Sequence, residues 1–216
     1  LTPAVLNVTV DPSPLPTISG PVNICTGSSD NVYETEPGMQ NYVWNISAGG
    51  IITAGGSSAD NTVTVTWDTE GSHTVTVNYE NEYGCDAVNP TVKNITVNPV
   101  VTPTITGIAE VCEGSENRVY STQSGMSDYV WTVYGGTITA GGTLTDNTVT
   151  ITWTDPGTDS VTVNYVTSDG CTSRTAVKEV NVKPLPVPSV QGNDNVCIGS
   201  AGNIYTTDPG MANYIW

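Results

Sequence analysis

The sequence predicts an all-β protein of tandem β-sandwich repeats, which Pro-rich connectors join end to end. One observation is that the chain consists of short alternating runs of Thr, Val, Asn and Gly with frequent turn signals and no helical period. A second is that Tyr42-Val43-Trp44 returns, with one conservative change, at residues 129–131 and 214–216, so that the motif recurs at nearly equal intervals. A fixed period indicates one structural unit that is used several times.

The repeat divides the chain into two complete units and parts of two others. Residues 13–99 and 100–184 form the complete units, and residues 185–216 match the first part of a unit. Residues 1–12 match the last strand of a unit, because their Asn-Val-Thr-Val run resembles the Asn-Ile-Thr-Val run that ends the first unit. We therefore expect the chain to be a piece of a longer array.

Each complete unit should contain about seven short strands and no helix longer than a turn. In the first unit, Val63, Val65 and Trp67 alternate with polar residues, and the segment from His73 to Tyr79 alternates in the same way. Period two between turn residues indicates half-buried antiparallel strands, and seven of them are typical of a β-sandwich. The strands expected in order are residues 17–19, 31–35, 42–47, 51–53, 62–67, 73–79 and 91–97, with copies that include 148–153, 160–165 and 176–182.

The two copies should differ mainly at a polar hairpin tip, residues 57–61 against 143–147. The connectors, residues 98–103 and 184–188, are rich in proline, which favours an extended and semi-rigid chain. We therefore expect a rod, with a spacing of roughly 35–45 Å per repeat from the strand lengths and loops.

The cysteines suggest disulfides, because units of this size bury little surface and are often stabilised by such bonds. The interval from Cys25 to Cys85 is almost the same as the interval from Cys112 to Cys171. This matched spacing predicts one bridge inside each repeat, worth roughly 4 kcal/mol, with buried free cysteines as the alternative. Cys197 would remain unpaired only because its partner lies beyond residue 216. Such bridges persist outside the cytosol.

Composition excludes several classes of function. The net charge of −16 disfavours binding to nucleic acid and to anionic membrane faces, and no stretch reaches the roughly 18 apolar residues of a membrane span. The single histidine, His73, has Asp159 in its place in the second repeat, so we expect a surface histidine and no catalytic residue. The chain is therefore not expected to be an enzyme.

Two kinds of binding site, for calcium and for sugars, are considered against a purely structural role of the same residues. Asp60-Asn61 and Asp146-Asn147 recur at matching turns, as do Glu36 and Asp208, but two oxygens per turn fall short of the six to eight ligands that calcium prefers. Calcium is thus a possible cofactor, with solvated turn residues favoured. Four tryptophans could stack on sugars, yet their strand positions favour the core, most clearly for the first and third: Trp44, Trp67, Trp131 and Trp153.

Three motifs recur together: Cys-x-Gly-Ser, Gly-Met-x-x-Tyr-x-Trp and Asp-Asn-Thr-Val-Thr-x-Thr-Trp. In combination they resemble the PKD-like family of Ig-like β-sandwiches, in the cysteine-bearing form found in long arrays of large Bacteroidetes-type surface proteins. The chain departs from the usual motif after the tryptophan, where residues 45–50 read Asn-Ile-Ser-Ala-Gly-Gly and phenylalanine is absent throughout.

The resemblance implies a parent exported by the type IX pathway and displayed on the outer cell surface. It favours a structural stalk of an adhesin in surface attachment or gliding motility, which holds a distal binding region away from the cell. Its partners would be other repeats of the chain, surface polysaccharide, or outer-membrane motility and secretion machinery. The alternatives are repeats that themselves bind polysaccharide or a partner subunit, and spacers of a secreted enzyme. Ser160 also resembles the O-glycosylation acceptor of such bacteria, within Asp-Ser-Val.

Overall fold

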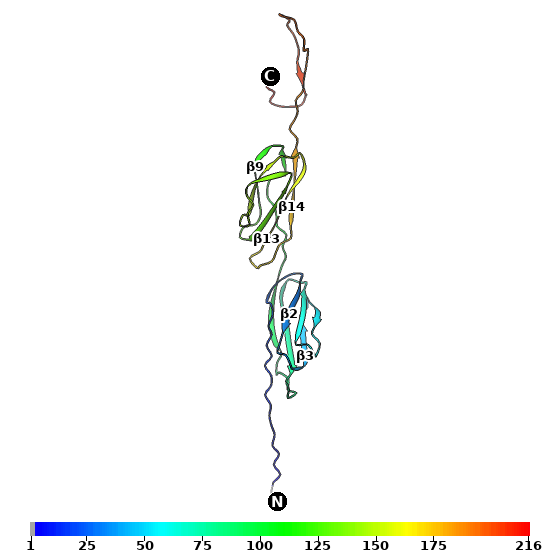
Figure 1. Cartoon of the computed structure of the whole chain (residues 1–216), viewed down its shortest axis with the longest axis vertical. Helices are drawn as coiled ribbons and strands as arrows, with labels where there is room; N and C mark the ends of the chain where they lie inside the picture. The colour runs from blue at the N-terminus through cyan, green and yellow to red at the C-terminus, as the bar shows by residue number, and fades with distance from the viewer. Residues whose placement is uncertain (1–2) are drawn as a thin grey trace.

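The structure, a computed structural model, describes residues 3–216 and contains two β-sandwiches that lie end to end along its long axis (Figure 1). No helix occurs in this described part, so the all-β prediction is confirmed. The first sandwich comprises β1 (Asn23–Cys25), β2 (Ser28–Glu34), β3 (Gln40–Ile46), β4 (Gly50–Gly55), β5 (Thr62–Trp67), β6 (Gly71–Glu80) and β7 (Thr91–Asn98). The second comprises β8 (Glu110–Cys112), β9 (Ser115–Ser121), β10 (Ser127–Tyr134), β11 (Gly136–Gly141), β12 (Thr148–Trp153), β13 (Gly157–Val166) and β14 (Ala176–Lys183).

Each sandwich packs a four-stranded sheet against a three-stranded sheet. In the first, the strand orders are β1-β7-β6-β3 and β2-β5-β4, and the second repeats them as β8-β14-β13-β10 and β9-β12-β11. All pairs are antiparallel except the short first strand, since β1 runs parallel to β7 and β8 runs parallel to β14. The first and last strands of a sandwich therefore point the same way.

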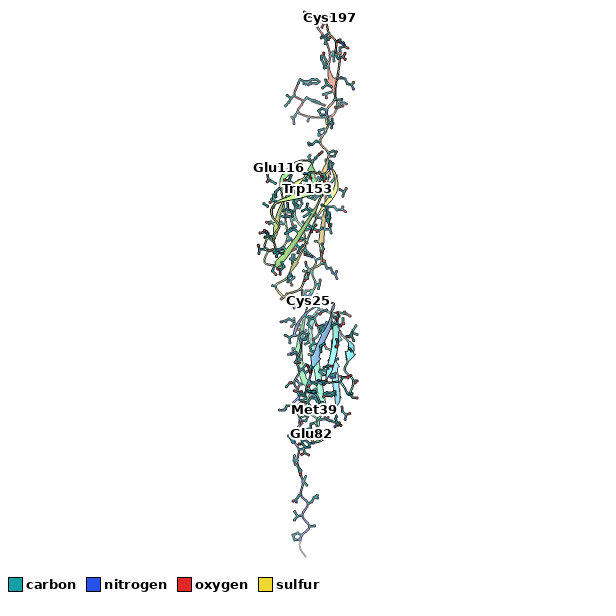
Figure 2. All side chains as sticks on the ribbon, viewed as in Figure 1. Cys25, Met39, Glu82, Glu116, Trp153 and Cys197 are labelled. Carbon is teal, nitrogen blue, oxygen red and sulfur yellow. A yellow bond between two sulfur atoms is a disulfide. The ribbon has the colours of Figure 1, made fainter. Side chains whose placement is uncertain are left out.

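This topology gives each sandwich two different ends. We call the end where the connector arrives the proximal pole and the end where the last strand finishes the distal pole. Met39 and Glu82 lie at the proximal pole of the first sandwich, and Cys25 lies at its distal pole beside the second sandwich (Figure 2). Because the chain enters at one pole and leaves at the other, successive sandwiches extend in one direction.

Period-two patterning accounts for the two cores. On β5, Val63, Val65 and Trp67 are 0% exposed, and the threonines between them are partly exposed. Trp44 and Trp131 are each 7% exposed, and the indole Nε1 of each donates to a backbone carbonyl 2.9 Å away. All four strand tryptophans therefore pack in cores and offer no exposed ring to a sugar.

The strands β5 and β12 have the bounds that the sequence predicts, residues 62–67 and 148–153. Residues 17–19 form no strand and contribute only a single bridge between Ser19 and Glu34, whereas β1 was not expected.

The two copies also differ elsewhere than predicted. The hairpin tips match, because Ser57 and Thr143 each donate a backbone N–H to the following aspartate at 3.0 Å. The extra residue instead lies in the turn between β3 and β4.

Candidate functional site: the junction between the repeats

A disulfide joins the two sandwiches. Cys25 bonds Cys171, across 146 residues of sequence and with 5.6 Å between the Cα atoms. The predicted pairs, Cys25 with Cys85 and Cys112 with Cys171, are therefore wrong. The thiols of Cys85, Cys112 and Cys197 are free in the described structure.

The physical reason is that the two cysteines of one repeat lie at opposite poles. Cys25 pairs with Asn98 at the end of β7, whereas Cys85 lies in the turn before β7 begins at Thr91. The eight residues of that strand span about 25 Å at 3.3 Å per residue. A disulfide needs Cα atoms within about 7 Å. A bridge inside one repeat is thus geometrically excluded.

The distal pole fixes Cys25 through the backbone of the neighbouring strand. Thr26 donates its N–H to the carbonyl of Asn98 at 2.8 Å and its hydroxyl to the same oxygen at 3.0 Å. Gly27 follows at φ +81°, a conformation that favours glycine, and donates to the carbonyl of Trp67 at 2.7 Å. These bonds hold Cys25 at the tip of the first sandwich.

The proximal pole of the second sandwich presents Cys171 in a tight turn between β13 and β14. The N–H of Thr167 donates to the carbonyl of Cys171 at 2.9 Å, and the N–H of Cys171 donates to Thr167 Oγ1 at 3.1 Å. Cys171 is 0% exposed in the assembled junction. Nearby, the connector lies against the same pole, because Arg174 N–H donates to the carbonyl of Val101 at 2.8 Å.

A polar clamp involves the residue that directly follows each Pro-rich connector. In the first repeat, both the N–H and the hydroxyl of Thr17 donate to Glu36, as does the hydroxyl of Thr35 at 2.7 Å. Burial alone raises the pKa of Glu36, but these hydrogen bonds outweigh it and lower the pKa to about 2. Tyr79 donates to the same carboxylate at 3.0 Å. Burial and then this contact raise the pKa of Tyr79 to about 12.

The clamp recurs with different chemistry in the other copies. Gln123 takes the place of Glu36 and contacts Thr104 through both its amide nitrogen and its oxygen, at 2.6 and 3.2 Å. In the following segment Asp208 accepts from the N–H and hydroxyl of Ser189 at 2.7 and 2.8 Å. Glu36 and Asp208, considered above as calcium ligands, thus accept hydrogen bonds from the residue that follows the connector.

Comparison with known proteins agrees with this architecture. The family described as PKD-like domain matches residues 11–94 and 98–182. The chain belongs to this family. No curated protein matches the sequence.

Several solved structures resemble the fold of these PKD-like repeats. The fibronectin(III)-like modules of Clostridium thermocellum CbhA are 14% identical with a TM-score of 0.38, over 79% of this chain and 95% of that one. The D00-D0 domain of intimin is 17% identical with a TM-score of 0.38, over 76% and 99% of the two chains. Invasin, described as a bacterial integrin-binding protein, is 15% identical with a TM-score of 0.32, over 82% and 42%. These similarities concern the fold alone.

The histidine of the first PKD-like repeat is buried, contrary to the expected surface position. His73 is 8% exposed, packs against Trp67 with 5.1 Å between ring centroids, and its Nε2 lies 2.9 Å from the carbonyl of Thr69. The extra residue in the β3–β4 turn makes room for it, and Ser47 of that turn lies 3.4 Å from the ring. Its position on the inward face of β6, in phase with Val75, was a signal for burial.

Asp159 fills the corresponding space in the second PKD-like repeat. The shorter turn places Gly135 against it, and a Cβ at that glycine would lie 2.0 Å from the carboxyl carbon. Its Oδ2 is buried without a hydrogen-bond partner. Burial, followed by repulsion from Asp155, raises the pKa of Asp159.

The remaining candidate sites stay separate from the junction. The carboxylates of Asp60 and Asp146 accept bonds within their own turns, and residues 3–216 hold no cluster of three His, Cys, Asp or Glu side chains suited to a metal ion. Ser160 is half-buried on β13, between Tyr134 and Glu179 of the neighbouring strands, and its glycosylation stays a prediction. Over the same described range, no helix has the length and apolar character needed to cross a membrane.

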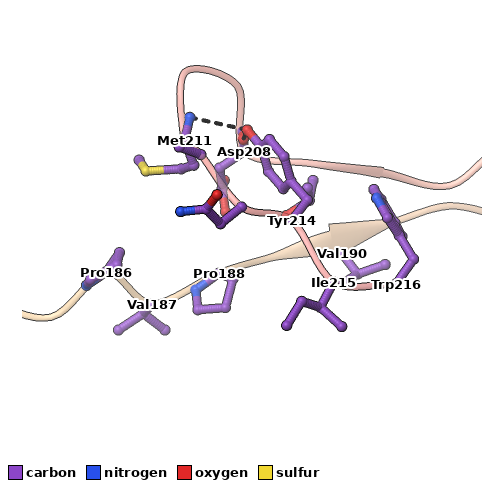
Figure 3. Close-up of a pocket in the computed structure, with 12 residues that line it drawn as sticks. Pro186, Val187, Pro188, Val190, Asp208, Met211, Tyr214, Ile215 and Trp216 are labelled. Atoms are coloured by element: carbon purple, nitrogen blue, oxygen red, sulfur yellow. Dashed lines mark hydrogen bonds between the residues drawn. The ribbon is translucent and has the colours of Figure 1, made fainter.

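An open pocket lies in the C-terminal segment, where β15 (Val190–Gln191) pairs with β16 (Thr206–Thr207). Figure 3 shows Tyr214, Ile215 and Trp216 beside Pro188 and Val190. The Met211 N–H donates to Tyr214 Oη at 3.0 Å, as Met39 does to Tyr42 in the first repeat. Trp216 corresponds in the repeat to the core residues Trp44 and Trp131, although it is exposed in this segment.

Proposed function

We propose that these PKD-like repeats form a load-bearing stalk segment of a large cell-surface adhesin. The observation that carries the proposal is the junction, where two sandwiches lie end to end and Cys25 bonds Cys171 across the boundary. A connector alone transmits pulling force but permits bending. A covalent bond beside the connector adds a second link between the same two bodies, and two links resist rotation better than one.

Several features support an extracellular location for this stalk. Disulfides form and persist in oxidising surroundings, and the net charge of −16 keeps a long array soluble and self-repelling. The resemblance to cysteine-bearing arrays of gliding-motility adhesins favours export by the type IX pathway and display on the outer surface. Labelling of intact cells with an antibody against this chain tests that location, and labelling only after permeabilisation would contradict it.

A second candidate function, direct binding of polysaccharide by each repeat, requires an exposed aromatic platform that recurs. The most exposed aromatic residues of the two complete repeats are Tyr83, 57% exposed, and Tyr134, 60% exposed. Their counterparts in the other repeat are Asp169 and Ser47, so neither platform recurs. This argues against a repeated sugar site, while a spacer in a secreted enzyme would use the same junction as a stalk.

Stiffness of the junction is the property to test. Small-angle scattering should give an elongated particle for the oxidised chain, and a broader distribution of inter-repeat distances for the variant with Cys25→Ser and Cys171→Ser. The variant with Cys197→Ser is the matched control, because that cysteine is exposed and unbonded. Equal distributions for bridged and unbridged chains would contradict the stalk proposal. Binding of the oxidised chain to a glycan array would favour the polysaccharide alternative.

A further inference from the structure

The free thiols of Cys85 and Cys112 lie at the positions in the repeat that Cys171 and Cys25 occupy in the bonded junction. Cys112 lies at the distal pole of the second sandwich, as Cys25 does in the first, and Cys85 lies at the proximal pole of the first, as Cys171 does in the second. We propose that each forms a disulfide with a cysteine of a neighbouring PKD-like unit in the same chain. Consecutive units would then be bonded at every junction.

The distal pole of the second sandwich reproduces the geometry that holds Cys25. Cys112 pairs with Lys183 at the end of β14, as Cys25 pairs with Asn98 at the end of β7. Glu113 donates its N–H to the carbonyl of Lys183 at 2.8 Å, the same distance as the equivalent bond in the first repeat. Cys112 is exposed at this pole, so a following unit can reach it.

The proximal pole of the first sandwich reproduces the turn that holds Cys171. The N–H of Asn81 donates to the carbonyl of Cys85 at 3.0 Å, and the N–H of Cys85 donates to Asn81 Oδ1 at 3.0 Å. The chain that precedes this sandwich also lies along the turn. Asn81 donates to the carbonyl of Pro12 at 2.9 Å, and the Ser13 hydroxyl donates to the carbonyl of Asp86 at 2.5 Å. A preceding unit would therefore approach Cys85 as the first sandwich approaches Cys171.

The bond requires an oxidant, which we identify by class as a low-molecular-weight disulfide such as oxidised glutathione. The Cys112 thiolate attacks one sulfur of the oxidant and releases one small thiol. The thiolate at the Cys85 position of the next unit then attacks the Cys112 sulfur and releases the second. Two protein thiols lose two protons and two electrons, and the oxidant's sulfur–sulfur bond is reduced to two thiols.

The resulting bridges would interlock along the array. Cys112 lies within the segment that the bond between Cys25 and Cys171 closes, so the loop of the next bridge overlaps the loop of the first. Every sandwich inside an array would be held at both poles. This inference rests on the positions of the cysteines and on the hydrogen bonds around them, and it does not depend on the proposed stalk function.

A chain with one more junction tests it. In this engineered chain, a copy of residues 1–184 is fused to a copy of residues 13–216. The fusion joins Pro184 to Ser13, which is the point where one repeat meets the next. After oxidation with glutathione and digestion without reductant, mass spectrometry should find the peptide pair Cys112–Cys85 across the new junction. Bridges between Cys25 and Cys171 in both halves report that the sandwiches are folded.

The matched variants are Cys112→Ser in the first half, which should leave the Cys85 thiol of the second half free, and Cys197→Ser, which should change nothing. Free thiols at both positions of the new junction, in a chain whose Cys25–Cys171 bridges have formed, would overturn the inference. So would Cys112 bonded to any other cysteine, including one in a second molecule.

Discussion

The bridge between Cys25 and Cys171 should prevent most of the chain from bearing a force that is applied at its two ends. When tension is applied through the termini, the load passes across the bond and bypasses the segment between the two cysteines, which are 146 positions apart in sequence. At 3.3–3.6 Å per residue, that segment would add about 500 Å to the extended chain. The oxidised protein should therefore extend less than the reduced protein in single-molecule pulling, by about 500 Å.

The single substitution Cys25→Ser separates this connectivity from the one that the spacing suggests. With the observed bridge, it releases the whole hidden length of about 500 Å. With one bridge inside each repeat, it would release only about 200 Å, because the second repeat would stay closed. The control Cys197→Ser should extend like the oxidised wild type. An increment of the smaller size, or full extension of the oxidised wild type, would refute the reasoning.

Three smaller predictions concern single repeats. The pKa of Glu36 is lowered to about 2, so its ionised carboxylate should add about 1–2 kcal/mol to the free energy of unfolding. This stabilisation should be present above pH 4.5 and lost as the pH falls towards 2. Glu36→Gln should remove this part of the pH dependence of the melting temperature. Trp153→Ala should cost about 3–5 kcal/mol in denaturant unfolding, whereas Trp216→Ala, at a residue 76% exposed, should cost almost nothing. Gly135→Ala should destabilise by about 1–3 kcal/mol through its clash with Asp159 and its φ of +75°; an unchanged melting temperature would contradict this.

Alternation in the sequence predicted most of the fold because each long strand has one buried face. The strand β5 has three fully buried residues in strict alternation, and its bounds follow from the sequence directly. The strand β1 was missed because it has only three residues and a single buried one, Ile24. Its existence depends on parallel pairing with β7, which lies at the opposite end of the repeat in the sequence.

The disulfide prediction failed because equal spacing fits two connectivities. A cysteine that bonds within its repeat and one that bonds to the next repeat recur with the same period. The strands themselves carried the missing information. Five strands, β2 to β6, lie between Cys25 and Cys85. Each strand crosses the sandwich once, so an odd number of strands leaves the chain at the pole opposite to the one where it started. The count of strands therefore excludes a bond within one repeat even before a structure is known.

The parallel pairing of β1 with β7 bears on how such a gene can change in length. Each unit begins at one end and finishes at the other, with its two cysteines at opposite ends. Unequal recombination that adds or removes one whole unit therefore leaves every internal cysteine opposite a partner of the right kind. A recombination out of register by part of a unit would leave unmatched thiols and broken sheets. Selection would thus tolerate rapid drift in the number of repeats while conserving the period of a single repeat.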